Sequence, residues 1–493
     1  LALVWGTYYG DTLLDAGTDV MTDNIGKVYM TGYTQSITNL ATSGVHQDTL
    51  AGGLFAAYLL KSDQYGNRIW STYFGGSGLE MTNAIMVDTF FNVTITGFTD
   101  SPDGIASDSC FQNTLAGASD AFVAQFNSNG QRLWSTYFGG ALDDSGAEID
   151  TDYNGYVYVA GKTQSPTNIA LGVAHQSSIG GLTDGFLAKL DTFGFPVWST
   201  YYGGADQDEA IAVAQEGNQI VLSGTTSSSN NIASIGAHKE NYSDEKDVFL
   251  ACFNQNGQRN WGTYYGDDEL DKATDVEIYN TKIYVVGITN SENNIVTQNA
   301  HKSVIDSTDA FLVKFDTLGT RMWGTYCGGE SYDEAIEIGV ELDSNIYIFG
   351  NTYSATHIAS YDNYDTTYAA ESDGFIAKFH YSGYFMHATY YGGNEQDRIL
   401  GGDVYGNTAV YVCGYTKSTD SIAYNTNLQD TLEGLQDGFL TRFNTKISTQ
   451  CNGVSGFPGI DTICQDTLIF TVADGALGQG ANWVWYIDGC GVD

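Results

Sequence analysis

The stretch Trp198-Ser199-Thr200-Tyr201-Tyr202-Gly203-Gly204 recurs in related form along the whole chain and sets its architecture. Its tryptophan position returns at spacings of 62 to 65 residues: Trp5, Trp70, Trp134, Trp198, Trp261, Trp323 and, in the last copy, His387. A fixed period with one supersecondary unit per copy is typical of repeat proteins. The sequence therefore predicts seven similar structural units.

Three further landmarks keep this period. A glycine opens Gly-x-Thr-x-Ser in every copy: Gly32, Gly97, Gly161, Gly224, Gly287, Gly350 and Gly414. An acidic residue stands ten positions after each tryptophan position: Asp15, Glu80, Asp144, Asp208, Asp271, Asp333 and Asp397. An Asp-Ala/Gly/Val-Phe triplet begins at Asp120, Asp184, Asp247, Asp309, Asp373 and Asp437, and Gly53 is taken as its counterpart in the first copy.

Each copy reads as four strands. In the fourth copy, residues 210–213 and 220–224 are short apolar runs separated by a Gly-Asn turn, and a long polar loop follows. Residues 247–253 and 258–265 form a second pair around Asn256-Gly257. Because no helical period appears, we expect four-stranded antiparallel sheets arranged around a centre, which is a β-propeller.

The two ends of the repeat region complement each other. Residues 1–9 match an outermost strand with no inner strands before it, whereas 400–404, 409–415 and 438–443 match three strands with no fourth. We therefore predict an all-β, seven-bladed β-propeller over residues 1–445, in which the N-terminal strand completes the last blade and removes its open edge. The position of Leu1 just before a repeat motif suggests a processed or truncated start.

These motifs resemble the SBBP β-propeller repeat, a family found in large secreted and surface proteins, many of them from the Bacteroidetes. The resemblance lies in Trp-Ser-Thr-Tyr-Tyr-Gly-Gly, Gly-x-Thr-x-Ser and Asp-Ala-Phe-Leu-Ala-Lys-Phe-like strands, and it spans about 445 residues. It implies the propeller fold and a secreted or cell-surface location, including export by type IX secretion. It implies no particular activity, because the family is defined by its repeat.

The amino-acid composition limits the classes of partner that the chain can bind. The chain has 19 Lys and Arg against 59 Asp and Glu, a formal net charge of −40. Such a polyanion repels nucleic acid and anionic lipid, and no apolar run reaches the length of a membrane span. We expect a protein or glycan partner at the cell surface, with neither nucleic-acid binding nor membrane insertion.

Residues 446–493 depart from the repeat. The alternation in 468–472 and the Trp-x-Trp-Tyr run predict the start of an immunoglobulin-like β-sandwich that needs further residues beyond Asp493. Cys451, Cys464 and Cys490 are candidates for disulfides there, with their pairing open. The propeller cysteines Cys110, Cys252, Cys327 and Cys413 fall in different blades, so we expect free thiols.

The sevenfold acid invites two interpretations. A ring of carboxylates at the channel mouth could hold Ca²⁺, but neighbouring blades lie about 10 Å apart and Ca²⁺ needs oxygens at about 2.3–2.6 Å. We favour carboxylates that accept backbone N–H groups within the turns between blades, and we expect no cofactor. His46, His175, His238 and His301 occupy related loop positions in different blades, so a packing role is favoured over one metal site.

Ligand binding is expected where the copies differ. The long loop of the sixth copy carries Tyr361, Tyr364 and Tyr368 among Asp, Asn and Thr residues. Tyrosine with neighbouring carboxylates suits recognition of sugars or proteins, although an ordinary exposed loop is the alternative.

No short catalytic motif is present, and departures from the repeat are mild: His387, Glu80 and Gly53. The sequence therefore predicts a non-catalytic extracellular or cell-surface scaffold for binding or adhesion. The alternative is a glycan-active enzyme or a lectin-like subunit that uses the face carrying the long loops.

Overall fold

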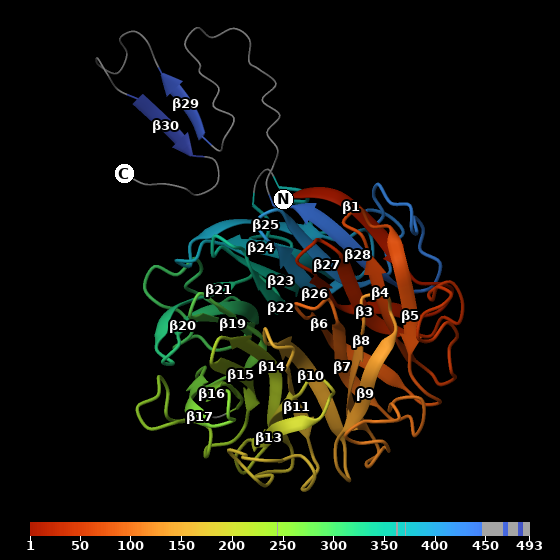
Figure 1. The fold of residues 1–493 in the computed structure, drawn as a ribbon. Helices are drawn as coiled ribbons and strands as arrows, with labels where there is room; N and C mark the ends of the chain where they lie inside the picture. The colour runs from red at the N-terminus through yellow and green to blue at the C-terminus, as the bar shows by residue number, and fades with distance from the viewer. Residues whose placement is uncertain (244, 361–362, 370, 446–466, 472–481, 487–493) are drawn as a thin grey trace.

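The computed structural model describes residues 1–243, 245–360, 363–369, 371–445, 467–471 and 482–486. The repeat region forms seven four-stranded antiparallel sheets arranged as blades around a central axis, in chain order around the ring (Figure 1). The seven-bladed β-propeller expected from the sequence is confirmed.

Blades 1 to 6 each use four consecutive strands, counted from the channel outward. Blade 1 contains β2 (Asp15–Thr22), β3 (Val28–Thr34), β4 (Ala56–Ser62) and β5 (Arg68–Phe74); blade 2 contains β6 (Glu80–Val87), β7 (Val93–Thr99), β8 (Asp120–Phe126) and β9 (Arg132–Phe138); blade 3 contains β10 (Asp144–Thr151), β11 (Val157–Thr163), β12 (Asp184–Leu190) and β13 (Pro196–Tyr202). Blade 4 contains β14 (Asp208–Glu216), β15 (Gln219–Thr226), β16 (Asp247–Asn254) and β17 (Arg259–Tyr265); blade 5 contains β18 (Asp271–Tyr279), β19 (Lys282–Thr289), β20 (Asp309–Asp316) and β21 (Arg321–Cys327); blade 6 contains β22 (Asp333–Val340), β23 (Ile346–Thr352), β24 (Asp373–Phe379) and β25 (Phe385–Tyr391).

Blade 7 joins the two ends of the repeat region. Its inner strands are β26 (Asp397–Tyr405), β27 (Ala409–Thr416) and β28 (Asp437–Asn444), and its outermost strand is β1 (Ala2–Tyr9). Strand β1 runs antiparallel to β28, with Tyr9 opposite Gly438 and Ala2 opposite Asn444. The red strand β1 and the blue strand β28 therefore lie side by side in one sheet (Figure 1). The pairing closes the ring and covers the edge of β28 that would otherwise be exposed.

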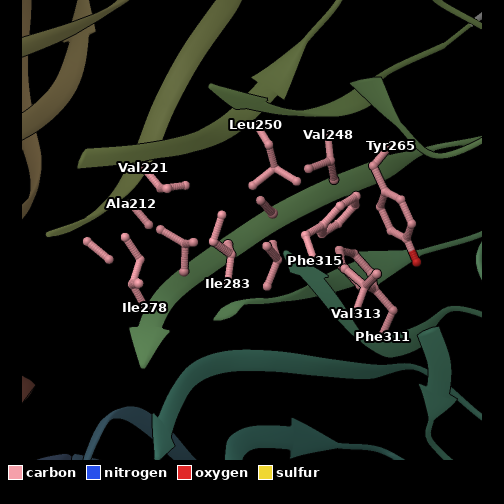
Figure 2. Packing of buried hydrophobic residues seen from close by; sticks show 14 of the residues in the cluster. Ala212, Val221, Val248, Leu250, Tyr265, Ile278, Ile283, Phe311, Val313 and Phe315 are labelled. Atoms are coloured by element: carbon pink, nitrogen blue, oxygen red, sulfur yellow. The ribbon is translucent and has the colours of Figure 1, made fainter. Parts of the chain in front are cut away.

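The blades pack through apolar faces. Between blades 4 and 5, side chains such as Val221 and Leu250 meet Ile278, Ile283 and Phe315 in one buried cluster (Figure 2). Each further interface has its own cluster of this kind. Strands that are apolar on both faces are expected here, since each sheet is covered by a neighbour on either side.

The recurrent tryptophan connects each blade to the next. Trp198 donates its indole N–H to the carbonyl oxygen of Gln255 at 3.0 Å, in the turn between the third and fourth strands of blade 4. Gly257 of that turn has φ +77°, and a Cβ there would come within 2.8 Å of the indole ring. Only glycine avoids both the strain and the clash.

His387 departs from this tryptophan pattern for a topological reason. It lies on β25 of blade 6, and the next blade takes its third and fourth strands, β28 and β1, from distant parts of the chain. No hairpin turn connects those two strands, so a tryptophan here has no turn glycine to pack against.

The long loop between the second and third strands covers the outer strand. In blade 1, the N–H of Thr42 donates to Ser71 O at 2.9 Å, and the N–H of Tyr73 donates to Gln47 O at 3.0 Å. The loop thus begins on the face where the innermost strands start, here called the upper face, and then runs along the circumference. It satisfies backbone groups that the outermost strand would otherwise expose.

Outside the propeller, β29 (Thr467–Thr471) and β30 (Asn482–Tyr486) form an antiparallel pair. Cys451, Cys464, Cys490 and most of the expected 446–493 sandwich lie outside the described residues. The free cysteines in the described chain are Cys110, Cys252, Cys327 and Cys413, as expected. Among the described residues, we find no helix that is long and apolar enough to cross a lipid bilayer.

Candidate functional site

The seven acids that follow the tryptophan motif are buried in the turns between blades. In blade 4, Asp208 accepts the N–H of Gly204 at 2.7 Å and the hydroxyl of Ser228 at 2.8 Å on one oxygen, and the Thr226 hydroxyl on the other. Thr226 and Ser228 belong to the Gly-x-Thr-x-Ser motif, which explains why the two motifs recur together. Burial raises the pKa of Asp208 to about 6, against the effect of these hydrogen bonds.

A second carboxylate lies beside most of these acids. Gly203 separates Asp184 of blade 3 from Asp208, because a Cβ on that glycine would meet Asp184 Cγ at 2.6 Å and Asp208 Oδ2 at 2.7 Å. Asp184 accepts backbone N–H groups from Gly180 and Gly181 in the returning loop. The paired carboxylates thus fasten two loops to one turn, and the first glycine of Gly-Gly leaves room for both.

The first copy breaks this pairing, and the structure corrects the sequence alignment there. Ala56, rather than Gly53, is the counterpart of the triplet aspartate, because Ala56 pairs with Thr34 as Asp120 pairs with Thr99. The facing acid is Glu80, one methylene longer than the aspartate of the other copies. Its carboxylate still binds Gly76 N–H at 3.1 Å and Thr99 Oγ1 at 2.8 Å. Glu80 and Ala56 together therefore replace the pair of aspartates that the other copies carry.

A different set of acids lines the central channel, where the structure has a cavity of about 430 Å³. Nine Asp and Glu residues line this cavity: Asp152 and Glu216, and the seven here called the channel carboxylates, Asp19, Glu148, Asp150, Asp275, Glu277, Glu337 and Asp403. The sequence interpretation missed them because they do not recur in every copy. Asp19, Glu148, Asp275 and Glu337 share one repeat position, which holds Ala84, Ala212 and Gly401 in the other blades.

Most of these channel acids connect neighbouring innermost strands. Asp19 of blade 1 accepts the N–H of Ile85 in blade 2 at 2.8 Å, and Asp275 of blade 5 accepts that of Ile338 in blade 6 at 2.9 Å. Glu337 reaches Gly402 in blade 7 at 2.6 Å. The innermost strands have no further strand to pair with, so the carboxylates accept N–H groups that would otherwise remain unpaired.

The concentration of carboxylates changes their protonation. Burial raises the pKa of Asp150 to about 7, and burial together with the neighbouring Asp19 and Asp275 raises the pKa of Glu148 well above its usual range. The pKa of Glu277 is also well raised by burial and by Asp150, Asp275 and Asp403. Desolvation and like charge both favour the neutral acid.

A second hollow, of about 520 Å³, opens at the upper mouth of the channel across blades 2, 3 and 4. Phe98, Ala147 and Ile211 line it with carbon, while Asp143, Gln164, Lys162 and Glu209 supply polar groups. Lys162 Nζ lies 3.6 Å from Glu209 Oε2, and both side chains are about half exposed, at 50% and 41%. We call this hollow the mouth pocket.

The other side of the mouth carries tyrosines. The rings of Tyr332 and Tyr353 in blade 6 lie 5.9 Å apart, and the Tyr332 hydroxyl donates to Glu334 at 3.0 Å. Glu334 also forms an ion pair with Arg398 of blade 7. The copies therefore differ around the upper mouth, although the turns beneath are built alike.

The blade-six tyrosines predicted from the sequence to bind a ligand lie away from the mouth pocket. Tyr364 packs its ring 5.3 Å from Phe443, and Tyr368 donates its hydroxyl to Glu371 O at 2.7 Å while packing near Tyr390. Tyr361 lies outside the described residues. This part of the loop runs along β25 at the circumference, so Tyr364 and Tyr368 are not brought together with the mouth pocket. Their role in binding stays a prediction.

The loop histidines lie between blades. His46 of blade 1 packs 5.7 Å from Phe126 of blade 2, and burial lowers its pKa to about 4. His175, His238 and His301 make equivalent ring contacts with Phe253, Phe315 and Phe379, each in the next blade. Within the described part of the chain, no group of three or more His, Cys, Asp or Glu side chains is arranged to hold a metal ion.

Comparison with known sequences agrees with the repeat. The profile of SBBP, described as a β-propeller repeat, matches residues 133–169. Regulatory protein FlaEY of Caulobacter vibrioides is 26% identical over 357 residues, which cover 67% of this chain and 35% of that protein. An uncharacterized WD repeat-containing protein, L264, of Acanthamoeba polyphaga mimivirus is 22% identical over 87% of this chain and 37% of its own length. The chain thus spans about a third of these relatives.

Several solved structures have a similar arrangement at low identity. They include the phage phi92 endosialidase (10% identical, 98% of this chain and 75% of that one, TM-score 0.40) and the polysaccharide lyase Uly1 (9%, 90% and 100%, TM-score 0.43). The polysaccharide lyase PL25-Ulvanlyase is also among them (10%, 88% and 95%, TM-score 0.44).

These structures correct the expectation that the chain is not an enzyme. That expectation was wrong, because it rested on missing short motifs and mild departures from the repeat, and proteins named as lyases and a sialidase appear among the similar structures. Catalytic groups on a propeller come from distant strands and need no contiguous motif. At TM-scores near 0.4 the similarity assigns no activity to this chain.

Proposed function

We propose that this chain is a binding propeller of the extracellular space or cell surface, which takes a protein or glycan partner on its upper face. The main support for this proposal is that the seven copies share the same turns but carry different side chains above them. The turns are fixed by the same buried acid, threonine and serine in blade after blade. The side chains that surround the channel mouth above those turns vary from blade to blade.

This contrast separates folding from recognition. A side chain needed for the blade recurs wherever the blade recurs, as Asp208, Thr226 and Ser228 do. At the position next to that threonine the copies carry Tyr33, Phe98, Lys162, Ile288 and Tyr415, which are at least partly exposed, and Thr225 and Asn351, which are buried. Such variety on rigid strand ends is what a specific binding face requires.

The proposed location and the proposal of a longer protein rest on the resemblance to SBBP repeats and on the length of the relatives. The repeats of this chain resemble the SBBP repeats of secreted Bacteroidetes proteins. The relatives are about three times as long as the region they share with this chain. We therefore propose a longer secreted or surface protein, with an Ig-like module after residue 446, further domains beyond Asp493 and a role in adhesion. The strong negative charge makes nucleic acid and anionic membrane poor partners.

A glycan-active enzyme is the second candidate, and the mouth pocket favours it. Asp143, Lys162 and Glu209 place two carboxylates and an amine around one hollow. Paired carboxylates catalyse proton transfer at glycosidic bonds, and a lysine amine can act as a general acid or base.

The test uses the whole chain and intact producing cells. Labelled protein would be applied to a glycan array and to extracts of surface proteins, and the same polysaccharides would be incubated with it and analysed for shortened products. Binding without product supports the scaffold, and release of product supports the enzyme. Protease treatment of intact cells that leaves the chain uncut would contradict the surface location.

A further inference from the structure

The mouth pocket differs from the rest of the upper face in being a defined hollow. It lies where β7, β11 and β14 end or begin, so its walls are carried by strands of three rigid blades. Its volume of about 520 Å³ falls within the ~300–1,000 Å³ typical of sites for small ligands. A protein partner needs an interface of about 800 Å² per side, which a single hollow of this size does not provide.

We propose that the mouth pocket binds one unit of a neutral saccharide, with Phe98 as its apolar platform and Gln164 and Asp143 as hydroxyl partners. This inference rests on the proposed function and names the ligand class of its upper face. An aromatic face carries a negative quadrupole that favours the C–H hydrogens of a sugar ring, and amide and carboxylate oxygens accept hydroxyl hydrogen bonds.

The charges in the pocket favour an uncharged ligand. Lys162 is paired with Glu209 at 3.6 Å, and Asp143 adds a further negative charge nearby. The pocket thus has no surplus cation to offset a sulfate or uronate. The formal charge of the whole chain, −40, opposes anionic polymers at longer range. A neutral sugar needs no cation in the pocket and is not repelled by the charge of the chain.

The repeat supplies substitutions that keep the fold. Phe98 pairs with Met81 as Thr225 pairs with Glu209 in blade 4, so Phe98→Thr installs a residue the blade already uses at that position. Gln164→Ser copies Ser227 of blade 4 in the same way. Phe193 is an exposed phenylalanine in the turn between β12 and β13 and does not line the pocket, so Phe193→Thr is the control.

The experiment applies the whole chain to an array of neutral, uronate-bearing and sulfated oligosaccharides, followed by calorimetry with the best neutral oligosaccharide. Phe98→Thr and Gln164→Ser should each weaken binding at least tenfold without changing the unfolding midpoint, and Phe193→Thr should leave affinity unchanged. Preference for acidic oligosaccharides would overturn the proposal, as would binding to none. Neutral-sugar binding that survives both variants overturns the site while leaving the proposed function standing.

Discussion

At the residue scale, the departures from the repeat are informative once neighbouring copies are compared in space. Ala56 and Glu80 lie in different blades and 24 positions apart in sequence, yet they replace an Asp–Asp pair found at the other interfaces. A shorter residue on one side meets a longer acid on the other. Comparison of the linear copies shows Glu80 as an isolated exception, because the partner is defined only by strand register.

This pairing predicts coupling between the two positions. Glu80→Asp should leave a gap in a buried turn, and Ala56→Asp should place a second carboxylate beside the longer glutamate, so each single change should destabilise by about 1–3 kcal/mol. The double variant restores the arrangement of the other interfaces. Its loss of stability should be at least about 1 kcal/mol smaller than the sum of the single losses in urea unfolding. Strict additivity would show that the two residues do not compensate.

Asp208 tests the role of the acid ring at the same scale. Its two oxygens accept one backbone N–H and two hydroxyl groups. Asp208→Ala leaves these buried donors without an acceptor and should cost more than about 2 kcal/mol, whereas Asp208→Asn keeps one acceptor and should cost less than about 1 kcal/mol. Thermal unfolding with added Ca²⁺ or chelator should be unchanged. A large stabilisation by Ca²⁺ that Asp208→Asn abolishes would instead assign metal binding to the ring.

At the element scale, the period of the sequence predicts the strands well because a blade imposes the same demands each time. The expected strand 247–253 is observed as Asp247–Asn254, and the expected 210–213 lies within Asp208–Glu216. The course of the long loop was not predictable from a single copy. Its backbone bonds join it to the outermost strand, about 28 residues away, and polar loop residues carry no pattern that identifies this partner.

Strand β1 provides the prediction at this scale. Removing residues 1–9 should expose the edge of β28 and abolish the contact of Trp5 with the turn between β4 and β5 of blade 1, where its indole donates to Gln64 O at 2.9 Å. We expect aggregation or a large fall in the unfolding midpoint, measured by light scattering and calorimetry. Removing residues 446–493 instead should leave the propeller monomeric. A monomeric 10–493 chain with an unchanged midpoint would contradict closure by β1.

At the scale of the whole molecule, recurrence shows what the fold needs and obscures what is particular to this chain. The acid ring was visible from the sequence because all seven copies carry it. The channel carboxylates and the mouth pocket were not, since each draws single residues from several blades. A usable signal was present: the position that carries Asp19, Glu148, Asp275 and Glu337 holds only alanine or glycine in the other three copies.

The channel carboxylates predict how stability depends on pH. Their folded-state pKa values are raised, to about 7 for Asp150, while in the unfolded chain they return to the ordinary range near 4. The folded protein therefore holds more protons between about pH 4 and pH 8, so the stability these groups contribute is present at low pH and lost as the pH rises through the folded values. The unfolding midpoint should be higher at pH 5 than at pH 8.

Glu277→Gln isolates the channel contribution from the general effect of net charge. Glu277 lines the channel cavity and its pKa is raised by burial and by surrounding carboxylates, so the neutral, nearly isosteric amide should raise the unfolding midpoint at pH 8 and leave it unchanged at pH 4. Glu395→Gln removes the same charge from an exposed position and should change neither midpoint by a comparable amount. If both variants stabilise equally at pH 8, the pH dependence comes from the overall negative charge. If Glu277→Gln lowers the midpoint at pH 8, the ionised carboxylate stabilises the channel.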